Sequence, residues 1–396
     1  MKQHDTEDIP GNGPAARDMP ADDGDPAMAR HLAARIAEAG GWLPFDRFMA
    51  EALHAPGLGY YNTGRRIFGH DPRGGSDFVT APELSPVFGR TLAAQVLQAL
   101  VASDTAEVLE FGAGSGALAE QLLETLPAAR PDGRPLQYAI LELSGALRAR
   151  QQARLARFAP RVRWLDAWPG TLRGVLVGNE VLDAMPVKLL RRQQGRWHER
   201  GVALDAAGRF AFADRDAPAG ADCASRADAA LAAWQGPDGA VTEIHPQAEA
   251  FIASLAARLE CGVALLIDYG FPEHEYYHPQ RSGGTLMCHR GHRADGDPLA
   301  DVGAKDITAH VNFSAIALAA QDAGLDVLGY TSQARFLVNC GIAEALAAAS
   351  LPERAMAQKL ITEHEMGELF KVIALARGCT LDDPLGFRVG DRSHRL

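Results

Sequence analysis

The chain has 396 residues, of which 47% are hydrophobic and 22% are charged. This composition indicates a folded protein with a core large enough for two lobes. The net charge of −11 at pH 7 and the lack of a basic patch exclude nucleic acid as an expected partner. The five scattered cysteines are typical of reduced thiols, so we expect a cytoplasmic location. Every apolar run is shorter than the roughly 20 residues that span a bilayer, so we expect no membrane span.

The N-terminal part is expected to contain a tail, a helical lobe and a lid. Residues 1–28 are rich in Asp, Pro, Gly and Ala, which predicts a disordered tail, and residues 29–103 predict the lobe. Acidic residues in the tail argue against a transit peptide. The segment Ser76–Glu83 could lie over a cofactor, with Asp77 and Thr80 facing it. Alternatively, it begins the helix expected over residues 84–101, because Pro is favoured in a first turn.

A glycine-rich turn follows an apolar strand in the next part of the chain. The strand 108–111 leads into Gly112-Ala113-Gly114-Ser115-Gly116, and a helix-forming run over 117–126 follows at once. In a doubly wound α/β sheet, a nucleotide-like cofactor binds at such a turn, where helix-start amides receive its anionic end. The sequence therefore predicts an α/β fold with a Rossmann-like sheet, and residues 104–378 as its core.

Two cofactors fit these glycines. Gly112, Gly114 and Ala117 satisfy the dinucleotide pattern. The shorter pattern of S-adenosylmethionine-dependent methyltransferases is satisfied by Gly112, Gly114 and Gly116, with Glu110 at the acidic position two residues earlier. A tight turn without a ligand is the third alternative.

Acidic residues close the next two strands. The strand 138–141 ends at Glu142, which could accept hydrogen bonds from ribose hydroxyls in either cofactor class. Its distance from Gly112 exceeds the about 20 residues of dinucleotide enzymes, which favours the methyltransferase. The strand 161–165 ends at Asp166, which could accept from an adenine amine, with Trp164 or Trp168 flanking the ring.

Two further buried strands also end in polar side chains. The strand 174–178 leads to Asn179, Glu180 and Asp183, and the strand 263–267 leads to Asp268. Ligands of open α/β sheets bind beyond the carboxyl ends of the strands, so these side chains are expected at the transfer site. Because clustered carboxylates repel each other, stability alone does not account for them.

The later part of the chain supplies candidates for the substrate side. His289 lies in Cys288-His289-Arg290-Gly291-His292, but zinc sites usually pair two short spacings, and no partner pair follows. We therefore expect no metal and assign His289 to the substrate. His310 and Asn312 stand in an alternating stretch and are expected to line the acceptor cleft.

The core is expected to carry an insertion and a cap. Residues 188–240 predict a hairpin, over 187–191 and 197–202, and then an Ala/Asp-rich loop suited to substrate selection. Two late strands, 325–330 and 370–375, flank cap helices within 333–365. Residues 379–396 are the expected C-terminal tail.

Several of these motifs together resemble the MidA-like class I methyltransferases. The resemblance runs from about Gly59 to Gly378. It is carried by Gly59-Tyr60-Tyr61, the segment Gly75 to Ser85, the turn Leu109 to Gly116, the segment Gly178 to Val187, Asp268-Tyr269-Gly270, and the segment Asp306 to Phe313.

The resemblance implies transfer of a methyl group from S-adenosylmethionine to an arginine of a protein. The mitochondrial members of the family are arginine methyltransferases that assist respiratory complex I assembly, so a hydrophilic complex I subunit is the implied partner. A guanidinium stays protonated up to a pKa above about 12, so carboxylates must fix its plane and stabilise the proton that it loses. We assign this role to Glu180 and Asp183, with Asn179 beside them.

Three other functions stay open at this point. A dehydrogenase with a nicotinamide cofactor fits the glycine spacing, and a non-catalytic assembly factor could retain the cofactor fold. A small-molecule methyl acceptor would need the same cofactor.

Overall fold

The computed structural model describes residues 25–64, 67, 69, 76–130, 132–216, 231, 234 and 236–396. Most of the expected N-terminal tail and of the Ala/Asp-rich loop lies outside the described residues. The first helix, α1 (Pro26–Glu38), begins two residues before the expected end of the tail. Its start is fixed by Pro26 in the first turn and by Asp25, whose side chain accepts a hydrogen bond from the Ala27 N–H at 2.8 Å.

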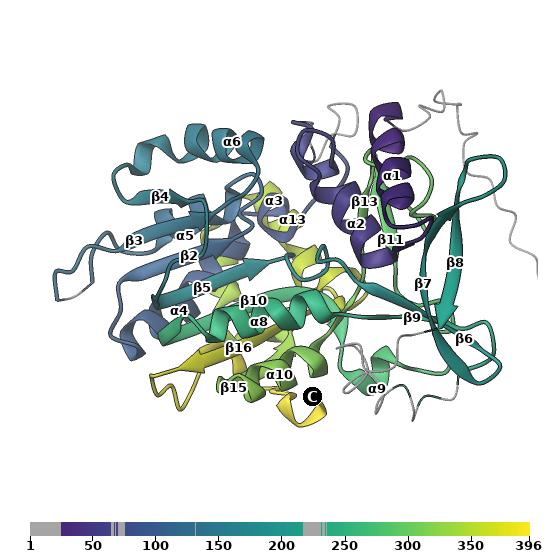
Figure 1. Ribbon diagram of the computed structural model, residues 1–396. Helices are drawn as coiled ribbons and strands as arrows, with labels where there is room; N and C mark the ends of the chain where they lie inside the picture. Colours follow the sequence, from purple (N-terminus) through teal and green to yellow (C-terminus); the bar gives the residue numbers. More distant parts are fainter. Residues whose placement is uncertain are drawn as a thin grey trace, which may run out of the picture.

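A mostly parallel sheet forms the centre of the larger lobe (Figure 1). Its main strands lie in the order β15-β16-β10-β5-β2-β3-β4, with β16 antiparallel to both of its neighbours and β14 paired to β10. The strands are β2 (Glu107–Phe111), β3 (Gln137–Leu141), β4 (Val162–Leu165), β5 (Leu172–Asn179), β10 (Leu259–Phe271), β14 (Val311–Asn312), β15 (Asp326–Ser332) and β16 (Phe370–Arg377). The central strands are continuous apolar runs because helices cover both faces of the sheet.

Two layers of helices cover this sheet (Figure 1). One layer contains α4 (Val87–Ala102), α5 (Ala117–Thr125), α11 (Gln333–Asn339), α12 (Ile342–Ala348) and α13 (Leu351–Ile361). The other contains α8 (Pro246–Ala256) and α10 (Phe313–Asp322). The helix α6 (Gly145–Leu155) connects β3 to β4, with the 3-10 turn Ala156–Phe158 at its end. The architecture is therefore the expected α/β fold with a Rossmann-like sheet, which helices cover on both faces.

The N-terminal helices and the insertion form one smaller lobe. A second sheet has the order β1-β7-β6-β9, with β8 paired to β7. Its strands are β1 (Leu43–Pro44), β6 (Lys188–Gln193), β7 (Arg196–Leu204), β8 (Phe210–Asp216) and β9 (Val241–Ile244). Leu43 pairs with Val202, and α1 and α2 (Phe45–His54) pack on this sheet through the apolar side chains of Met28, Phe48 and Val187. The expected hairpin is present, but it continues into a third strand, β8.

The helix expected over residues 84–101 is broken. The short helix α3 (Ala81–Leu84) stops at Ser85, whose backbone is extended, and α4 starts after Pro86. Proline has no N–H to continue the first helix, so the break follows from its position. The helix α4 packs on the large sheet, whereas α1 and α2 pack in the smaller lobe.

Short elements complete the described chain. These are the 3-10 turn η1 (Tyr60–Asn62), α9 (Glu273–Tyr276), the three-stranded sheet of β11 (Met287–Arg290), β12 (Arg293–Asp295) and β13 (Asp306–Thr308), the π-helical turn Glu363–Gly367, and the turns Leu385–Phe387 and Ser393–Arg395. Residues 379–396 pack on the core, where the Phe387 ring lies edge-on to Phe336 at 5.4 Å. Among the described residues, no helix is long and apolar enough to cross a membrane.

Candidate active site

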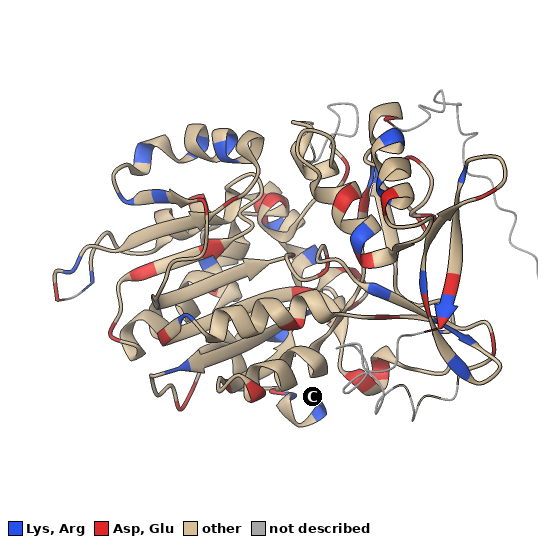
Figure 2. Cartoon of the chain, viewed as in Figure 1, with Lys and Arg blue, Asp and Glu red and all other residues tan. Residues whose placement is uncertain are grey.

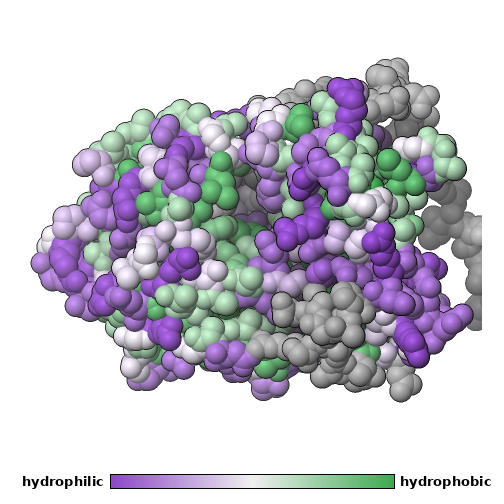
Figure 3. Space-filling view, viewed as in Figure 1, coloured by the Kyte–Doolittle hydropathy of each residue, from purple (hydrophilic) through white to green (hydrophobic). Residues whose placement is uncertain are grey.

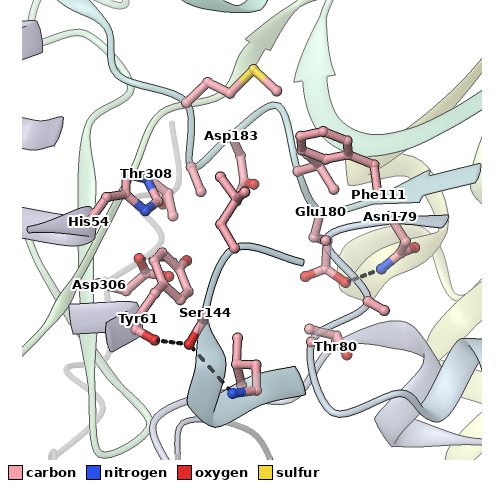
Figure 4. A pocket seen from close by; sticks show the side chains of 18 of the residues that line it. His54, Tyr61, Thr80, Phe111, Ser144, Asn179, Glu180, Asp183, Asp306 and Thr308 are labelled. Carbon is pink, nitrogen blue, oxygen red and sulfur yellow. Dashed lines mark hydrogen bonds between the residues drawn. The ribbon is translucent and has the colours of Figure 1, made fainter. Parts of the chain in front are cut away.

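A large cavity of about 1320 Å³ lies at the carboxyl ends of the strands of the large sheet, between the two lobes (Figure 3). We define its cofactor half by Gly112–Ser115, Glu142–Leu147, Trp168 and Phe251. We define its acceptor half by a second set of lining residues: His54, Tyr61, Asn179, Glu180, Asp183, Tyr269, Asp306, Thr308 and His310. Figure 4 labels all of these residues except Tyr269 and His310. A ligand pocket is usually about 300–1,000 Å³, so this cavity has room for a cofactor and part of a second reactant.

The glycine turn has the backbone that its sequence requires. The φ angles of Gly112, Gly114 and Gly116 are 67°, 52° and 83°. A Cβ atom at Gly112 would also lie only 3.1 Å from Cγ2 of Val181. Gly116 precedes the first turn of α5, and the turn from Gly112 to Ser115 lines the cavity. This backbone would let a nucleotide-like cofactor in the cavity approach the N–H groups of the turn closely.

Two acids stand beside this turn. Glu110 lines the cavity and accepts a hydrogen bond from the Tyr138 hydroxyl at 2.7 Å, and burial raises its pKa to about 7. Glu142 follows β3 and accepts from the Ser144 N–H at 2.8 Å and from Gln151 Nε2 at 2.9 Å. Gln151 also donates to the Gly114 carbonyl at 2.9 Å, which joins the two cofactor motifs. Glu142 keeps lone pairs for the hydroxyls of a ribose.

Three aromatic rings that line the cavity pack against one another, and one of them precedes this turn directly. The rings of Phe111, Trp168 and Phe251 lie 4.8–5.5 Å from one another, and all three residues line the cavity. Such a wall suits a flat heterocycle, such as adenine. Of the two tryptophans in the sequence expectation, only Trp168 lies here. Trp164 is outside the cavity wall and donates to Gln151 at 3.1 Å.

Asp166 was expected to contact the adenine, but the structure places it away from the cavity. Its side chain is 85% exposed, lies outside the cavity lining and pairs with Arg148 at 2.5 Å, on a helix rich in arginine (Figure 2). Exposed pairs of this kind contribute about 0–1 kcal/mol.

We predict that Asp166→Asn leaves the affinity for the cofactor within about twofold of wild type. Calorimetric titration of both proteins checks this. A tenfold loss of affinity in the variant would indicate that Asp166 does contact the adenine.

The acceptor half is built around a turn that follows β5. Glu180 has a left-handed φ of 54°, which an ordinary residue rarely adopts, and it directs its side chain into the cavity (Figure 4). Its carboxylate accepts from Asn179 Nδ2 at 2.9 Å and from the Ala81 N–H at 3.3 Å. Thr80, which precedes Ala81, also lines the cavity. The segment Ser76–Glu83 thus reaches this site through Thr80 and Ala81.

Asp268 was expected on the substrate side, but the structure places it beneath this turn. Its carboxylate is 1% exposed and lies outside the cavity lining. One oxygen accepts from the N–H groups of Val181, Leu182 and Asp183 at 2.9–3.3 Å, and the other accepts from that of Tyr269 at 2.9 Å. Asp268 therefore holds the turn that carries Glu180 and Asp183.

Three carboxylates gather in the acceptor half. Burial, together with the charge of Asp183, raises the pKa of Glu180 and of Asp306 to about 8. Burial raises the pKa of Asp183 above its usual range, and its Oδ1 has no hydrogen-bond partner among the described residues. No role was predicted for Asp306, although it begins the last of the segments that carry the family resemblance.

The other substrate candidates are divided between the cavity and the scaffold. His289 and His310 line the cavity, and burial lowers the pKa of His310 to about 4. Asn312 instead caps α10, accepting from the Ala315 N–H at 3.2 Å, and lies outside the cavity lining. Asp77, expected at the cofactor, also lies outside it. Its carboxylate accepts from the Tyr60 hydroxyl and the Gly291 N–H, both at 2.8 Å.

These acids predict how stability depends on pH. Because the folded-state pKa of Glu180 lies well above its ordinary value of about 4.3, the folded protein holds a proton that the unfolded chain releases. Wild-type stability should therefore fall as pH rises between these two pKa values. Glu180→Gln removes this loss, so the melting temperature of the variant relative to wild type should increase from about pH 5 to about pH 9. A difference in melting temperature between variant and wild type that does not change with pH would contradict the raised pKa of Glu180.

No group of three or more His, Cys, Asp or Glu side chains in the described part of the chain could hold a metal ion. The cofactor half of the site offers glycine amides, a strand-end acid and aromatic rings. Carboxylates, histidines and tyrosines lie in the acceptor half. This arrangement suits a nucleotide-like cofactor with a second, polar reactant beside it.

Comparisons with known proteins match both the sequence and the fold of this chain. The profile of the family described as "Putative S-adenosyl-L-methionine-dependent methyltransferase" matches residues 91–331. A crystal structure from Burkholderia thailandensis, bound to S-adenosyl-homocysteine, is 55% identical, with a TM-score of 0.87 over 93% of this chain and 96% of that one. A native crystal structure from the same organism is 53% identical, with a TM-score of 0.83 and the same coverage.

More distant relatives carry names that state an activity. The mitochondrial protein arginine methyltransferase NDUFAF7 homolog of Drosophila melanogaster is 26% identical over 90% of this chain and 86% of its own. That of Danio rerio is 26% identical over 80% and 77%. Of the two cofactors that fit the glycines, S-adenosylmethionine is the one that the matched family uses. The chain belongs to this family of S-adenosylmethionine-dependent methyltransferases.

Proposed function

We propose that this methyltransferase modifies a guanidinium nitrogen of an arginine in a protein. The observation that carries the proposal is the group of Glu180, Asp183 and Asp306 in the acceptor half. Burial and mutual repulsion keep Glu180 and Asp306 largely protonated near neutral pH, and Asp183 leaves one buried oxygen without a partner. A planar cation with several N–H donors would relieve the repulsion and fill the open acceptor. A guanidinium has both properties.

The residues of the chain then have distinct tasks in the reaction. When bound, the cofactor supplies an electrophilic methyl group on a sulfonium. Glu180, Asp183 and Asp306 hold the guanidinium in one plane, and orientation of this kind supplies roughly 7–11 kcal/mol in well-aligned reactions. As the N–CH3 bond forms and the S–CH3 bond breaks, one N–H proton leaves the guanidinium. A bound guanidinium favours the charged form of Glu180, which then accepts this proton, because its pKa of about 8 without the cation lies close to neutral pH.

Two further points support a protein as the acceptor. The relatives from Drosophila melanogaster and Danio rerio are both named protein arginine methyltransferases. The cavity is also lined by residues of both lobes, including Ala50 and Gly57 of the smaller one and Gln247 and Ser254 of the larger one, so an extended segment has surface to contact. A hydrophilic core subunit of respiratory complex I is the first candidate to test, given the family resemblance.

The test is transfer of a labelled methyl group into protein. Purified protein is incubated with methyl-labelled S-adenosylmethionine and an extract of cells that lack it. The labelled protein is then hydrolysed and its amino acids are separated. Label in methylarginine supports the proposal, and label in another amino acid or in a small molecule contradicts it. Cofactor binding without any transfer would favour the non-catalytic assembly factor.

A further inference from the structure

A chain of hydrogen bonds connects the two halves of the cavity through Tyr61. The Ser144 N–H donates to Glu142 at 2.8 Å, and the Ser144 hydroxyl donates to the Tyr61 carbonyl at 2.9 Å. The Tyr61 hydroxyl donates to Asp306 Oδ1 at 2.9 Å. Figure 4 shows Tyr61 between Ser144 and Asp306. The chain thus runs from the acid beside the cofactor turn to a carboxylate of the acceptor half.

Tyr61 is held firmly in this position. Its ring stacks on His54, with centroids 5.5 Å apart and an angle of 15° between the planes. The His54 imidazole forms a hydrogen bond with the backbone of Ala184, next to Asp183. Asn62, in the same turn as Tyr61, donates to the His54 carbonyl at 2.8 Å. Because Tyr61 is tied to His54 and Asn62, a shift of the Ser144 loop would move these three residues together.

The neighbouring tyrosine has a different environment. The hydroxyl of Tyr60 donates to Asp77 at 2.8 Å, and neither residue lines the cavity. Both tyrosines belong to η1, and each donates one hydrogen bond to a carboxylate. Tyr60 is therefore a matched control for the loss of one hydroxyl from this turn.

We propose that Tyr61 is a positioning residue that couples the two halves, so that a filled cofactor half raises the affinity of the acceptor half for a guanidinium. The inference rests on the proposed function, because it requires a cationic acceptor. A ligand that bonds to Glu142 orders the loop at Ser144. The ordered Ser144 hydroxyl fixes the Tyr61 carbonyl, and the ring then holds Asp306 in the orientation that receives the cation. By linkage, the acceptor must raise the affinity for the cofactor by the same factor.

The test measures this factor with a defined probe. The affinity for S-adenosyl-homocysteine is measured by calorimetry with and without acetyl-arginine-amide, and acetyl-citrulline-amide serves as the neutral control. We expect the arginine probe to increase the affinity of the wild type by about fivefold or more. Tyr61→Phe keeps the carbonyl and the ring but loses the bond to Asp306, so the factor should fall to about one. Tyr60→Phe should keep the wild-type factor.

A second measurement separates coupling from a general structural effect. The Tyr61 hydroxyl lowers the pKa of Asp306, so its loss should move the pH dependence of probe binding to higher pH in Tyr61→Phe and not in Tyr60→Phe. Equal coupling in wild type and Tyr61→Phe would overturn the role of Tyr61. Binding of the probe that does not respond to S-adenosyl-homocysteine would overturn the coupling and leave the proposed function intact. If the complex with S-adenosyl-homocysteine did not bind the arginine probe, both the coupling and the proposed function would be contradicted.

Discussion

Replacing Glu180 by glutamine should lower the rate of methyl transfer by about 100- to 1,000-fold, which is the usual cost of removing one preorganised charge-stabilising group. Glutamine keeps the size and the hydrogen-bonding reach of the side chain, but it has no charge for the guanidinium and cannot take its proton. The affinity for S-adenosyl-homocysteine should stay within about twofold, because Glu180 contacts Asn179 and Ala81 and not the glycine turn. Single-turnover kinetics with methyl-labelled S-adenosylmethionine measure the rate.

Glu142→Ala should have the opposite effect to Glu180→Gln, because it should lower cofactor affinity more than the rate of transfer. Glu142 lies beside the glycine turn and is joined to it through Gln151, so its loss should weaken cofactor binding. Transfer at saturating cofactor should then be reduced much less than in Glu180→Gln. If Glu180→Gln kept wild-type transfer, or if both variants lost only cofactor affinity, the division into two halves would be incorrect.

Gly112→Ala should weaken binding of S-adenosyl-homocysteine by about tenfold or more. The left-handed backbone costs a residue with a Cβ atom about 1–2 kcal/mol, and at a φ of 67° this strain falls on the turn that approaches the cofactor. The new Cβ would also press on Val181 at 3.1 Å, in the turn that begins with Glu180. Calorimetric titration with S-adenosyl-homocysteine and, separately, with NAD measures the effect.

Gly195 provides a matched control for this strain. It has a φ of 75° in the hairpin between β6 and β7, and a Cβ there would meet no atom within 4 Å. Gly195→Ala should cost a similar amount of stability and leave cofactor affinity unchanged. Equal affinities in Gly112→Ala and wild type would remove the glycine turn from the cofactor site.

The sequence predicted the features of the site that depend on local order along the chain. The strand before Gly112, the glycines and the acid Glu142 form one βαβ unit, whose geometry follows from short-range pattern. Asn179, Glu180 and Asp183 follow a buried strand, and all three line the cavity. The position of a residue at a strand end, however, does not determine where its side chain points.

Residues that sequence reasoning misplaced illustrate this limit. Asp268 ends a strand as Glu180 does, yet its carboxylate accepts N–H groups of the neighbouring turn. Asn312 caps a helix, and Asp166 pairs with an arginine in solvent. Tyr61 and Asp306 are 245 positions apart in the chain and meet only through tertiary packing, so no local pattern joins them. The pairing of Leu43 with Val202, which merges the N-terminal helices with the insertion, is equally non-local.

The carboxylate cluster is the central element of this account, and a crystal structure of the complex with S-adenosyl-homocysteine and acetyl-arginine-amide tests it most directly. We predict a guanidinium held by Glu180, Asp183 and Asp306, with one of its nitrogens facing the sulfur of the cofactor product. A guanidinium bound elsewhere, with these three carboxylates contacting only protein or water, would contradict the account.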